Sequence, residues 1–235
     1  FPMATTEAGR MPALPPRLAV FDMDGTLIDS LPDLAACACR LLRHYGLPPV
    51  TPDILRPMIG DGVGVLVRRV LAHAGDAARD IDRDEAVGHY MADYTPHSTD
   101  LSHPFTGTRA TLSSLKGSGW KLAVCTNKPV AAAQHILRVM KLDPWFDAVG
   151  GGDSFAVRKP DPRHLLGTIA MAGGVPERAI MVGDHRNDIA AATGAHVRGI
   201  FARWGYGLPD MEAGATAGAD SISEIPHIAR DLIPE

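Results

Sequence analysis

The sequence predicts an α/β protein in which a parallel β-sheet carries an inserted, all-helical segment. Beyond Pro104, apolar runs of strand length alternate with helical patterns. This order is typical of strand–helix–strand units and of the parallel sheets that they build. Between Leu31 and His103 the patterns are helical, and no convincing strand is found. A chain of 235 residues is long enough for one large domain or for a domain with an insert.

The first strand is predicted in the apolar run that begins at Leu18 and ends abruptly in Asp22 and Asp24. Its near-continuous apolar character indicates a strand buried on both faces of a sheet. Pro32 in the first turn and Gly46 after the last turn are typical of the start and the end of a helix. The helices of the insert are expected at residues 33–45, 52–58, 62–74 and 84–95.

The rest of the chain alternates between the two kinds of element. Strands are expected at residues 120–126, 146–150, 179–184, 197–201 and 219–222, and helices at 107–117, 129–141, 161–172 and 187–194. The sequence therefore predicts three parts. They are a flexible N-terminal segment (1–17), a core (18–30 and 104–235) and a helical insert (31–103).

The composition argues against several classes of protein. The formal net charge is −4, so no basic surface indicates a nucleic acid or an anionic membrane as partner. No apolar run is long enough to span a bilayer, and the first residues lack the apolar stretch of a signal peptide. Cys37, Cys39 and Cys125 have neither the spacing of a disulfide framework nor that of a zinc site. We expect a cytoplasmic protein, either a monomer or a homodimer.

Polar side chains follow the predicted strands where parallel strands end together. They are Asp22 and Asp24, Thr126 and Asn127, Lys159, and Asp184 and Asp188. Ligands of open α/β sheets bind at this carboxyl edge. Each residue alone has an ordinary alternative, because an aspartate after a strand often caps a helix and a lone loop lysine is usually solvated. The coincidence of all four groups favours a functional site.

Four aspartates in one small site repel one another, and this repulsion calls for a cation. A carboxylate that attacks a phosphate dianion must also overcome a repulsion of about 4 kcal/mol per charge pair at 4 Å in a partly screened site. A hard divalent metal with oxygen ligands, together with Lys159, would nearly balance the four carboxylates. Such a site suits phosphoryl transfer. Thr126 offers a hydroxyl to a phosphate oxygen, and Gly25 lets the backbone approach closely and offers amides.

In this order, the motifs resemble those of the haloacid dehalogenase-like superfamily. They are Asp22–Met23–Asp24–Gly25–Thr26, Thr126–Asn127, Lys159–Pro160 and Gly183–Asp184–His185–Arg186–Asn187–Asp188. The resemblance covers essentially the chain from Leu18 onward. It implies a Rossmann-like core with a helical cap domain at residues 31–103. His185 departs from the small Ser or Thr that is common after the Gly–Asp pair, whereas the three residues after it match well.

The resemblance also implies a role for each matching residue. Asp22 would be the nucleophile that forms an aspartyl-phosphate, and Asp24 would be the general acid and then the general base. Lys159 would be the third catalytic residue. Mg²⁺ is the implied cofactor, and its expected ligands are Asp22, the backbone carbonyl of Asp24, Asp184 and Asp188. The residues expected to hold the substrate or its phosphoryl group are Thr126, Asn127, Lys159, Gly25 and Arg69.

Details of the sequence narrow the family further. Asp24 counts against dehalogenases, which lack that second acid. Phosphonatases and β-phosphoglucomutases place a lysine in the cap, whereas every lysine of this chain lies outside residues 31–103. The segments Val157–Pro162, Gly205–Gly207 and Ile59–Gly62 are similar to those of phosphoglycolate phosphatases. Such enzymes hydrolyse 2-phosphoglycolate to glycolate and phosphate.

Arg69, downstream in the cap, is a candidate for binding a substrate carboxylate bidentately. The alternative is a solvated helix arginine, such as Arg68 beside it. The sequence thus predicts a Mg²⁺-dependent phosphomonoesterase of a small phosphorylated metabolite, with 2-phosphoglycolate as the leading substrate. Three alternatives stay open: a sugar-phosphate phosphatase, a pyrophosphatase, and a binding or regulatory module that kept the scaffold without activity.

Overall fold

The computed structural model describes residues 13–235, and within them a six-stranded sheet forms the centre of the core. Its strands are β1 (Leu18–Phe21), β4 (Lys121–Cys125), β5 (Ala148–Gly150), β6 (Ala179–Gly183), β7 (Arg198–Ala202) and β8 (Ala217–Ala219). They lie in the order β5-β4-β1-β6-β7-β8 and all pair in parallel. The chain builds outward from β1 through β4 to β5 and then continues on the other side of β1. The topological switch point, where such sheets bind ligands, therefore lies at the carboxyl end of β1.

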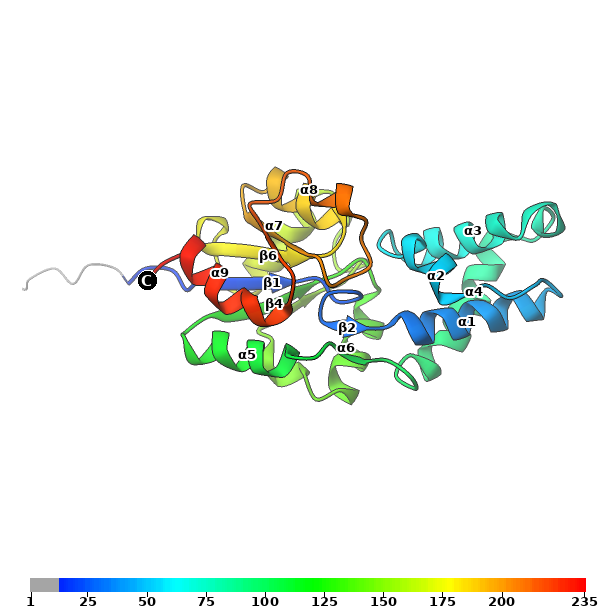
Figure 1. Ribbon diagram of the computed structural model, residues 1–235, viewed down its shortest axis with the longest axis horizontal. Helices are drawn as coiled ribbons and strands as arrows, with labels where there is room; N and C mark the ends of the chain where they lie inside the picture. Colours follow the sequence, from blue (N-terminus) through cyan, green and yellow to red (C-terminus); the bar gives the residue numbers. More distant parts are fainter. Residues whose placement is uncertain (1–12) are drawn as a thin grey trace, which may run out of the picture.

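Helices cover both faces of the sheet (Figure 1). They are α5 (Thr108–Gly117), α6 (Val130–Val139), α7 (Pro162–Met171), α8 (Arg186–Gly194) and α9 (Ile225–Leu232). Because side chains alternate along a strand, Ala19 and Phe21 pack in the apolar cluster that includes α5, α6 and α9. Leu18 and Val20 pack in the cluster that includes α7 and α8. This arrangement confirms the α/β fold with a strand buried on both faces.

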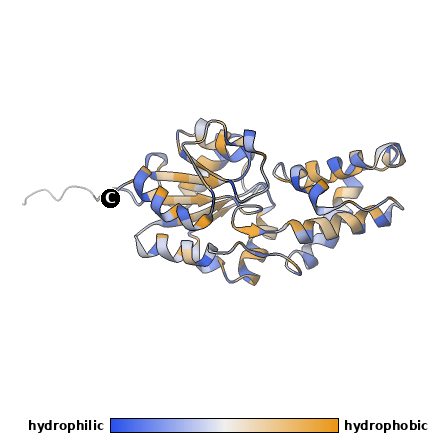
Figure 2. Cartoon of the chain, in the orientation of Figure 1, coloured by the Kyte–Doolittle hydropathy of each residue, from blue (hydrophilic) through white to orange (hydrophobic). Residues whose placement is uncertain are grey.

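The helices between residues 31 and 102 form a separate body beside the carboxyl edge of the sheet (Figure 1). We call this body the cap. Its helices are α1 (Leu31–His44), α2 (Pro52–Leu55), α3 (Val63–His73) and α4 (Arg83–His97), and they share one apolar cluster. Thr51 and Asp82 accept hydrogen bonds from the backbone N–H groups of Ile54 and Glu85, which caps α2 and α4. Figure 2 shows hydrophobic residues gathered along the strands and on the helices of both bodies.

The two chain segments that join cap and core lie side by side. β2 (Ile28–Asp29) and β3 (His103–Pro104) form a two-stranded antiparallel sheet. Asp33 adds four hydrogen bonds across the same junction, from the backbone N–H groups of Leu101 and Ser102 and from the Ser102 hydroxyl. The predicted boundary between residues 103 and 104 therefore falls inside β3.

Several expectations from the sequence need correction. The last strand lies at 217–219 and not at 219–222, because Ile222 begins a short helical turn and packs in the core. α9 was not expected. Arg17 was assigned to the flexible segment, yet its guanidinium is buried, donates to the Ser118 carbonyl (2.6 Å) and lies over the Trp120 ring. The rest of the predicted flexible segment, up to residue 12, lies outside the described residues.

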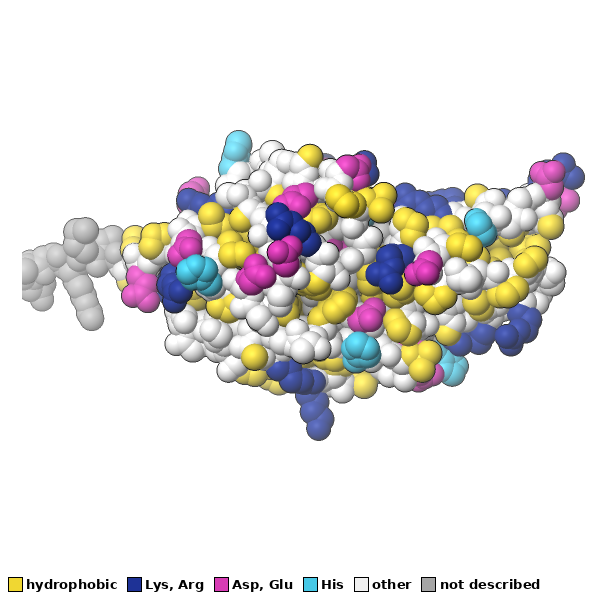
Figure 3. All heavy atoms as spheres, in the orientation of Figure 1, with side chains coloured by type: hydrophobic (Ala, Val, Ile, Leu, Met, Phe, Trp, Pro, Cys, Tyr) yellow, Lys and Arg dark blue, Asp and Glu magenta, His cyan; other side chains and the backbone are white. Residues whose placement is uncertain are grey.

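Short 3₁₀ turns complete the fold at residues 56–58, 75–78, 143–145, 176–178, 209–212 and 222–224. On the face shown in Figure 3, basic and acidic side chains are interspersed. Across the described part of the chain, every helix is too short or too polar to cross a bilayer.

Candidate active site

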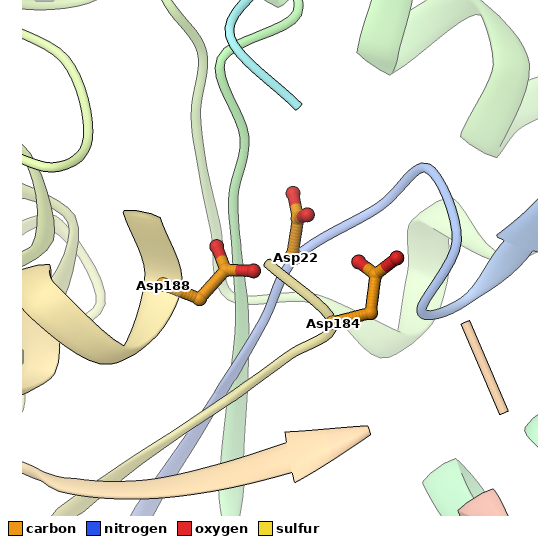
Figure 4. A group of neighbouring side chains, drawn as sticks. All are labelled: Asp22, Asp184 and Asp188. Atoms are coloured by element: carbon orange, nitrogen blue, oxygen red, sulfur yellow. The ribbon is translucent and has the colours of Figure 1, made fainter. Parts of the chain in front are cut away.

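Three buried carboxylates meet at the carboxyl edge of the sheet, at the switch point (Figure 4). Asp22 follows β1, Asp184 follows β6, and Asp188 lies in the first turn of α8. One carboxylate oxygen from each lies within 4.8 Å of the others. The register explains this convergence, because Phe21 pairs with Val182 and brings the two strand ends level. The structure thus brings together three of the residues that the sequence predicted as metal ligands.

The start of α8 fixes the position of Asp188. The Asp188 carboxylate accepts a hydrogen bond from the His185 N–H (3.0 Å), and the His185 ring accepts one from the Asn187 N–H (3.2 Å). These two bonds form a capping box. His185, which stands where the resemblance expected a small Ser or Thr, therefore caps α8 itself. Gly183 is required before it, because a Cβ atom there would collide with the Asp188 carboxylate.

Lys159 supplies a positive charge to this site. Its Nζ lies 3.1 Å from Asp22 Oδ1 and 2.6 Å from Asp188 Oδ1, and it donates to the Cys125 carbonyl at 2.6 Å. Burial alone would lower the pKa of Lys159, but the charges of Asp188 and Asp22 raise this pKa above its ordinary range. The lysine therefore stays protonated at the bottom of the site.

One ammonium does not balance three buried carboxylates. Burial, and then the charge of Asp188, raise the pKa of Asp22 well above its usual range and raise that of Asp184 to about 7. Thr26 and the Tyr206 N–H oppose this shift by donating hydrogen bonds to Asp184 at 3.1 and 2.7 Å. A set of clustered carboxylate oxygens that is short of positive charge fits a hard divalent cation.

Asp24 and Gly25 shape the turn after β1. A Cβ atom on Gly25, whose φ is 82°, would collide with the Asp184 carboxylate and the Tyr206 ring. The close backbone approach predicted for Gly25 is therefore seen. Its own N–H donates to the Ile28 carbonyl at 2.9 Å, and the expected donation of amides to a phosphoryl group stays a prediction.

Thr126 and Asn127 follow β4 beside Asp22. The Thr126 oxygen accepts a hydrogen bond from the Lys128 N–H (3.2 Å) and lines the cavity above the site. The amide of Asn127 donates to the carbonyls of Lys159 (2.8 Å) and Gly60 (3.1 Å). Asn127 therefore braces the core against the cap, and its contact with a substrate stays a prediction.

Arg69 lies apart from the other predicted site residues. Its guanidinium is paired with Asp61 (2.7 Å) and donates to the Met58 carbonyl (2.9 Å). Asp61 in turn accepts a hydrogen bond from Asn187 of the core at 2.7 Å. Arg69 does not line the cavity, so the structure shows it holding a contact between cap and core. Its binding to a substrate carboxylate stays a prediction.

A cavity lies between the carboxyl edge and the cap. The cap covers it with mainly apolar side chains: Leu34, Ile59, Val63, Leu66, Tyr90, Met91 and Tyr94. The core contributes Asp22, Asp24, Thr126 and Lys128 among others. Sequence reasoning gave no role to Lys128 or Tyr94. The position of Lys128 directly after Thr126–Asn127, and the Tyr90/Tyr94 spacing of one helical turn, were the available signals.

A parallel sheet with three buried carboxylates at its switch point and a cavity above them is typical of α/β enzymes, the class to which we assign the chain. The comparison with family models agrees: the model described as haloacid dehalogenase-like hydrolase matches residues 19–202. The chain belongs to this family. The predicted resemblance and the prediction of an enzyme are confirmed.

Curated relatives cover most of the chain. A phosphoglycolate phosphatase of Agrobacterium fabrum is 41% identical over 80% of this chain and 81% of its own length. One of Pseudomonas putida is 39% identical over 95% of this chain and 80% of its own. Among solved structures, a predicted phosphoglycolate phosphatase from Haemophilus somnus superposes with a TM-score of 0.84 at 30% identity, and the match covers 91% of this chain and 97% of that one.

Proposed function

We propose that this hydrolase is a Mg²⁺-dependent phosphatase of small phosphorylated metabolites, with 2-phosphoglycolate as its leading substrate. The observation that carries the proposal is the pairing of Asp22 with Lys159 (3.1 Å) at the bottom of a cavity that Asp24 also lines. A nucleophile, a cation and a second acid are the groups that transfer of a phosphoryl group to a carboxylate requires. The names of the curated relatives support the choice of substrate.

The reaction proceeds in two displacements. A carboxylate oxygen of Asp22 attacks the phosphorus, the bond from phosphorus to the ester oxygen breaks, and the Asp24 carboxyl gives its proton to that oxygen. Asp24 then takes a proton from water, whose oxygen attacks the phosphorus of the aspartyl-phosphate. The second displacement releases phosphate and restores Asp22. Lys159 and the Thr126 hydroxyl hold the transferring group through its oxygens.

A metal ion would balance the negative charge of the clustered carboxylates. Asp22, Asp184 and Asp188 would hold Mg²⁺ with the backbone carbonyl of Asp24, and the bound ion would supply positive charge to the phosphoryl oxygens. The chain's own part is to hold these carboxylates in place, through the Thr26 and Tyr206 hydrogen bonds to Asp184 and the capping box of α8.

The other candidate functions differ in defined ways. A sugar-phosphate phosphatase or a pyrophosphatase would use the same groups on a different leaving group. A binding or regulatory module needs no nucleophile and acid, so the pairing of Asp22 with Lys159 beside Asp24 argues against it.

A panel of phosphorylated metabolites, assayed for phosphate release with Mg²⁺ and with a chelator, tests the proposal. We expect Mg²⁺-dependent turnover and the highest kcat/KM for 2-phosphoglycolate. Turnover that the chelator leaves unchanged would contradict the metal dependence. A higher kcat/KM for a sugar phosphate or for pyrophosphate would show that 2-phosphoglycolate is not the preferred substrate.

A further inference from the structure

The cavity contains a second buried lysine that the phosphoryl chemistry above does not use. Lys128 lies in the turn between β4 and α6, and its side chain is 6% exposed. It is the one basic side chain that lines the cavity, counted over the described residues. Lysine is seldom buried without a partner, so its surroundings indicate what it can bind.

Lys128 has two polar partners, and only one of them is well aligned. Its Nζ donates a hydrogen bond to the Tyr94 hydroxyl at 2.6 Å. It also lies 3.2 Å from Asp24 Oδ1, an ionic contact without hydrogen-bond geometry, since this oxygen accepts no hydrogen bond from any described residue. An ammonium carries three N–H donors. Lys128 therefore keeps donors for a ligand in the cavity.

The Lys128–Tyr94 pair is chemically suited to an anion. It presents an ammonium, which offers N–H donors only, and a phenolic O–H. Charge-assisted hydrogen bonds from such donors favour an anion as ligand.

The place of the pair shows which part of a substrate it would meet. Asp22 and Thr126 line the phosphoryl side of the cavity, and Lys159 pairs with Asp22 beneath it. Asp24, which protonates the leaving oxygen in the proposed reaction, contacts Lys128. The leaving group must therefore lie beside Lys128.

We propose that Lys128 and Tyr94 bind an anionic group on the leaving-group side of the substrate, a carboxylate close to the ester oxygen. The inference rests on the proposed function and deepens it. Most of the cap side of the wall supports it, because Leu34, Leu66 and Met91 offer no partner to sugar hydroxyls, and a buried hydroxyl without a partner is costly. The favoured substrates are short phosphorylated carboxylic acids.

The test compares one charged and one neutral leaving group in the Lys128→Met variant. kcat/KM is measured with Mg²⁺ for 2-phosphoglycolate and for 2-hydroxyethyl phosphate, which lacks the carboxylate. The proposal expects the preference for 2-phosphoglycolate to fall roughly 10- to 100-fold, as for a lost hydrogen bond to a charged group. Tyr94→Phe should reduce the preference by a smaller factor, roughly 5-fold.

Three further variants control this experiment. Lys116→Met removes a lysine that pairs with Asp147 outside the cavity, and the preference should not change. Arg69→Ala tests the residue that the sequence had suggested for the same carboxylate, and the preference should change less than in Lys128→Met. Lys128→Arg keeps the charge and should retain part of the preference, which separates recognition from a failure of Lys128→Met to fold.

If Lys128→Met lowers kcat/KM equally for both substrates, the inference is overturned, because Lys128 would then act only through Asp24. That result would leave the proposed phosphatase function unaffected. A preference that changes in Arg69→Ala and not in Lys128→Met would overturn it too. Measurements of ligand affinity test the inference independently if the protein shows no turnover. Calorimetry would compare the Asp22→Asn variant with the double variant that also carries Lys128→Met. The affinity for 2-phosphoglycolate should be lower in the double variant, and the affinity for 2-hydroxyethyl phosphate should be the same in both. Equal weakening of both ligands would overturn the inference.

Discussion

The core and the cap line one cavity with opposite kinds of side chain. From the core come Asp22, Asp24, Thr126, Asn127 and Lys128, whereas the cap contributes mainly apolar side chains and two tyrosines. The difference separates two tasks. In the proposed mechanism the core holds charge where the phosphoryl group reacts, and the cap, together with Lys128 of the core, surrounds the leaving group. Apart from Lys128, changes in the core should therefore affect kcat, and changes in the cap should affect KM and the choice of substrate.

The strongest test of this division is Asp22→Asn. Loss of the nucleophile should lower kcat for p-nitrophenyl phosphate by a factor on the order of 10⁴ or more, as for nucleophiles of other hydrolases. Asp53→Asn makes the same chemical change at an exposed cap position and should leave kcat within about twofold. Full activity in Asp22→Asn would refute the aspartyl-phosphate route.

The cap side of the comparison is tested by Leu66→Ala. Leu66 is 4% exposed and lines the cavity, so its truncation should reduce the free energy of unfolding by about 2–4 kcal/mol. Because Leu66 touches no reacting atom, we expect a raised KM and a kcat within roughly threefold of the unchanged protein. Urea unfolding and steady-state kinetics measure the two effects. A drop in kcat as large as that of Asp22→Asn would remove the distinction between the two regions.

The metal site predicts a pH dependence that belongs to the core alone. Burial raises the pKa of Asp184 from its ordinary value of 3.8 to about 7, so its ionised form is disfavoured in the folded protein. As pH rises from about 4 to 7, the metal-free protein should lose stability, and a bound cation should restore it. We expect Mg²⁺ to raise Tm by several degrees more at pH 8 than at pH 5.

Thermal melts in Mg²⁺ and in chelator at the two pH values measure this difference. Asp184→Asn provides the control, since an amide has no charge to relieve and the pH dependence of the Mg²⁺ effect should shrink. An equal Mg²⁺ shift at both pH values would count against the carboxylate site.

The smallest effect is expected where cap and core touch. Asn187→Ala removes the 2.7 Å hydrogen bond to Asp61, on a partly exposed contact that also includes the Arg69 ion pair. Such contacts contribute about 1 kcal/mol or less, so KM should rise roughly two- to fivefold at an unchanged unfolding midpoint. High salt should reduce the difference between variant and parent. A lower kcat with KM unchanged would contradict this prediction and would indicate that Asn187 acts in the chemical step rather than in the contact between cap and core.

The residues at the carboxyl edge of the sheet could be predicted from the sequence, whereas those that form the cavity wall could not. Asp22 and Asp184 could be placed together because apolar runs end at both, and the ends of parallel strands meet. The closeness of Lys128 to Tyr94 depends on how α4 docks over the core, which no local pattern encodes. The sequence did not reveal the ion-pair partner of Arg69. This partner, Asp61, is brought to Arg69 by the glycine-flanked turn before α3, whose shape depends on the folded structure. β2 and β3 are two residues each, too short for a strand pattern.

The junction of β2 with β3 also bears on the order in which the chain assembles. β1 pairs with β4 over a long separation, Leu18 with Lys121, and closing a long loop slows folding. The helices of the cap pack on one another within residues 31–97, a shorter stretch of chain than the one that separates β1 from β4, and we expect them to form early. Once β2 and β3 are paired and Asp33 is bonded to residues 101 and 102, the loop that remains to be closed is only the short chain on either side of that junction. We therefore expect the early-folding cap to act as a kinetic clamp that brings the two central strands of the catalytic sheet into register.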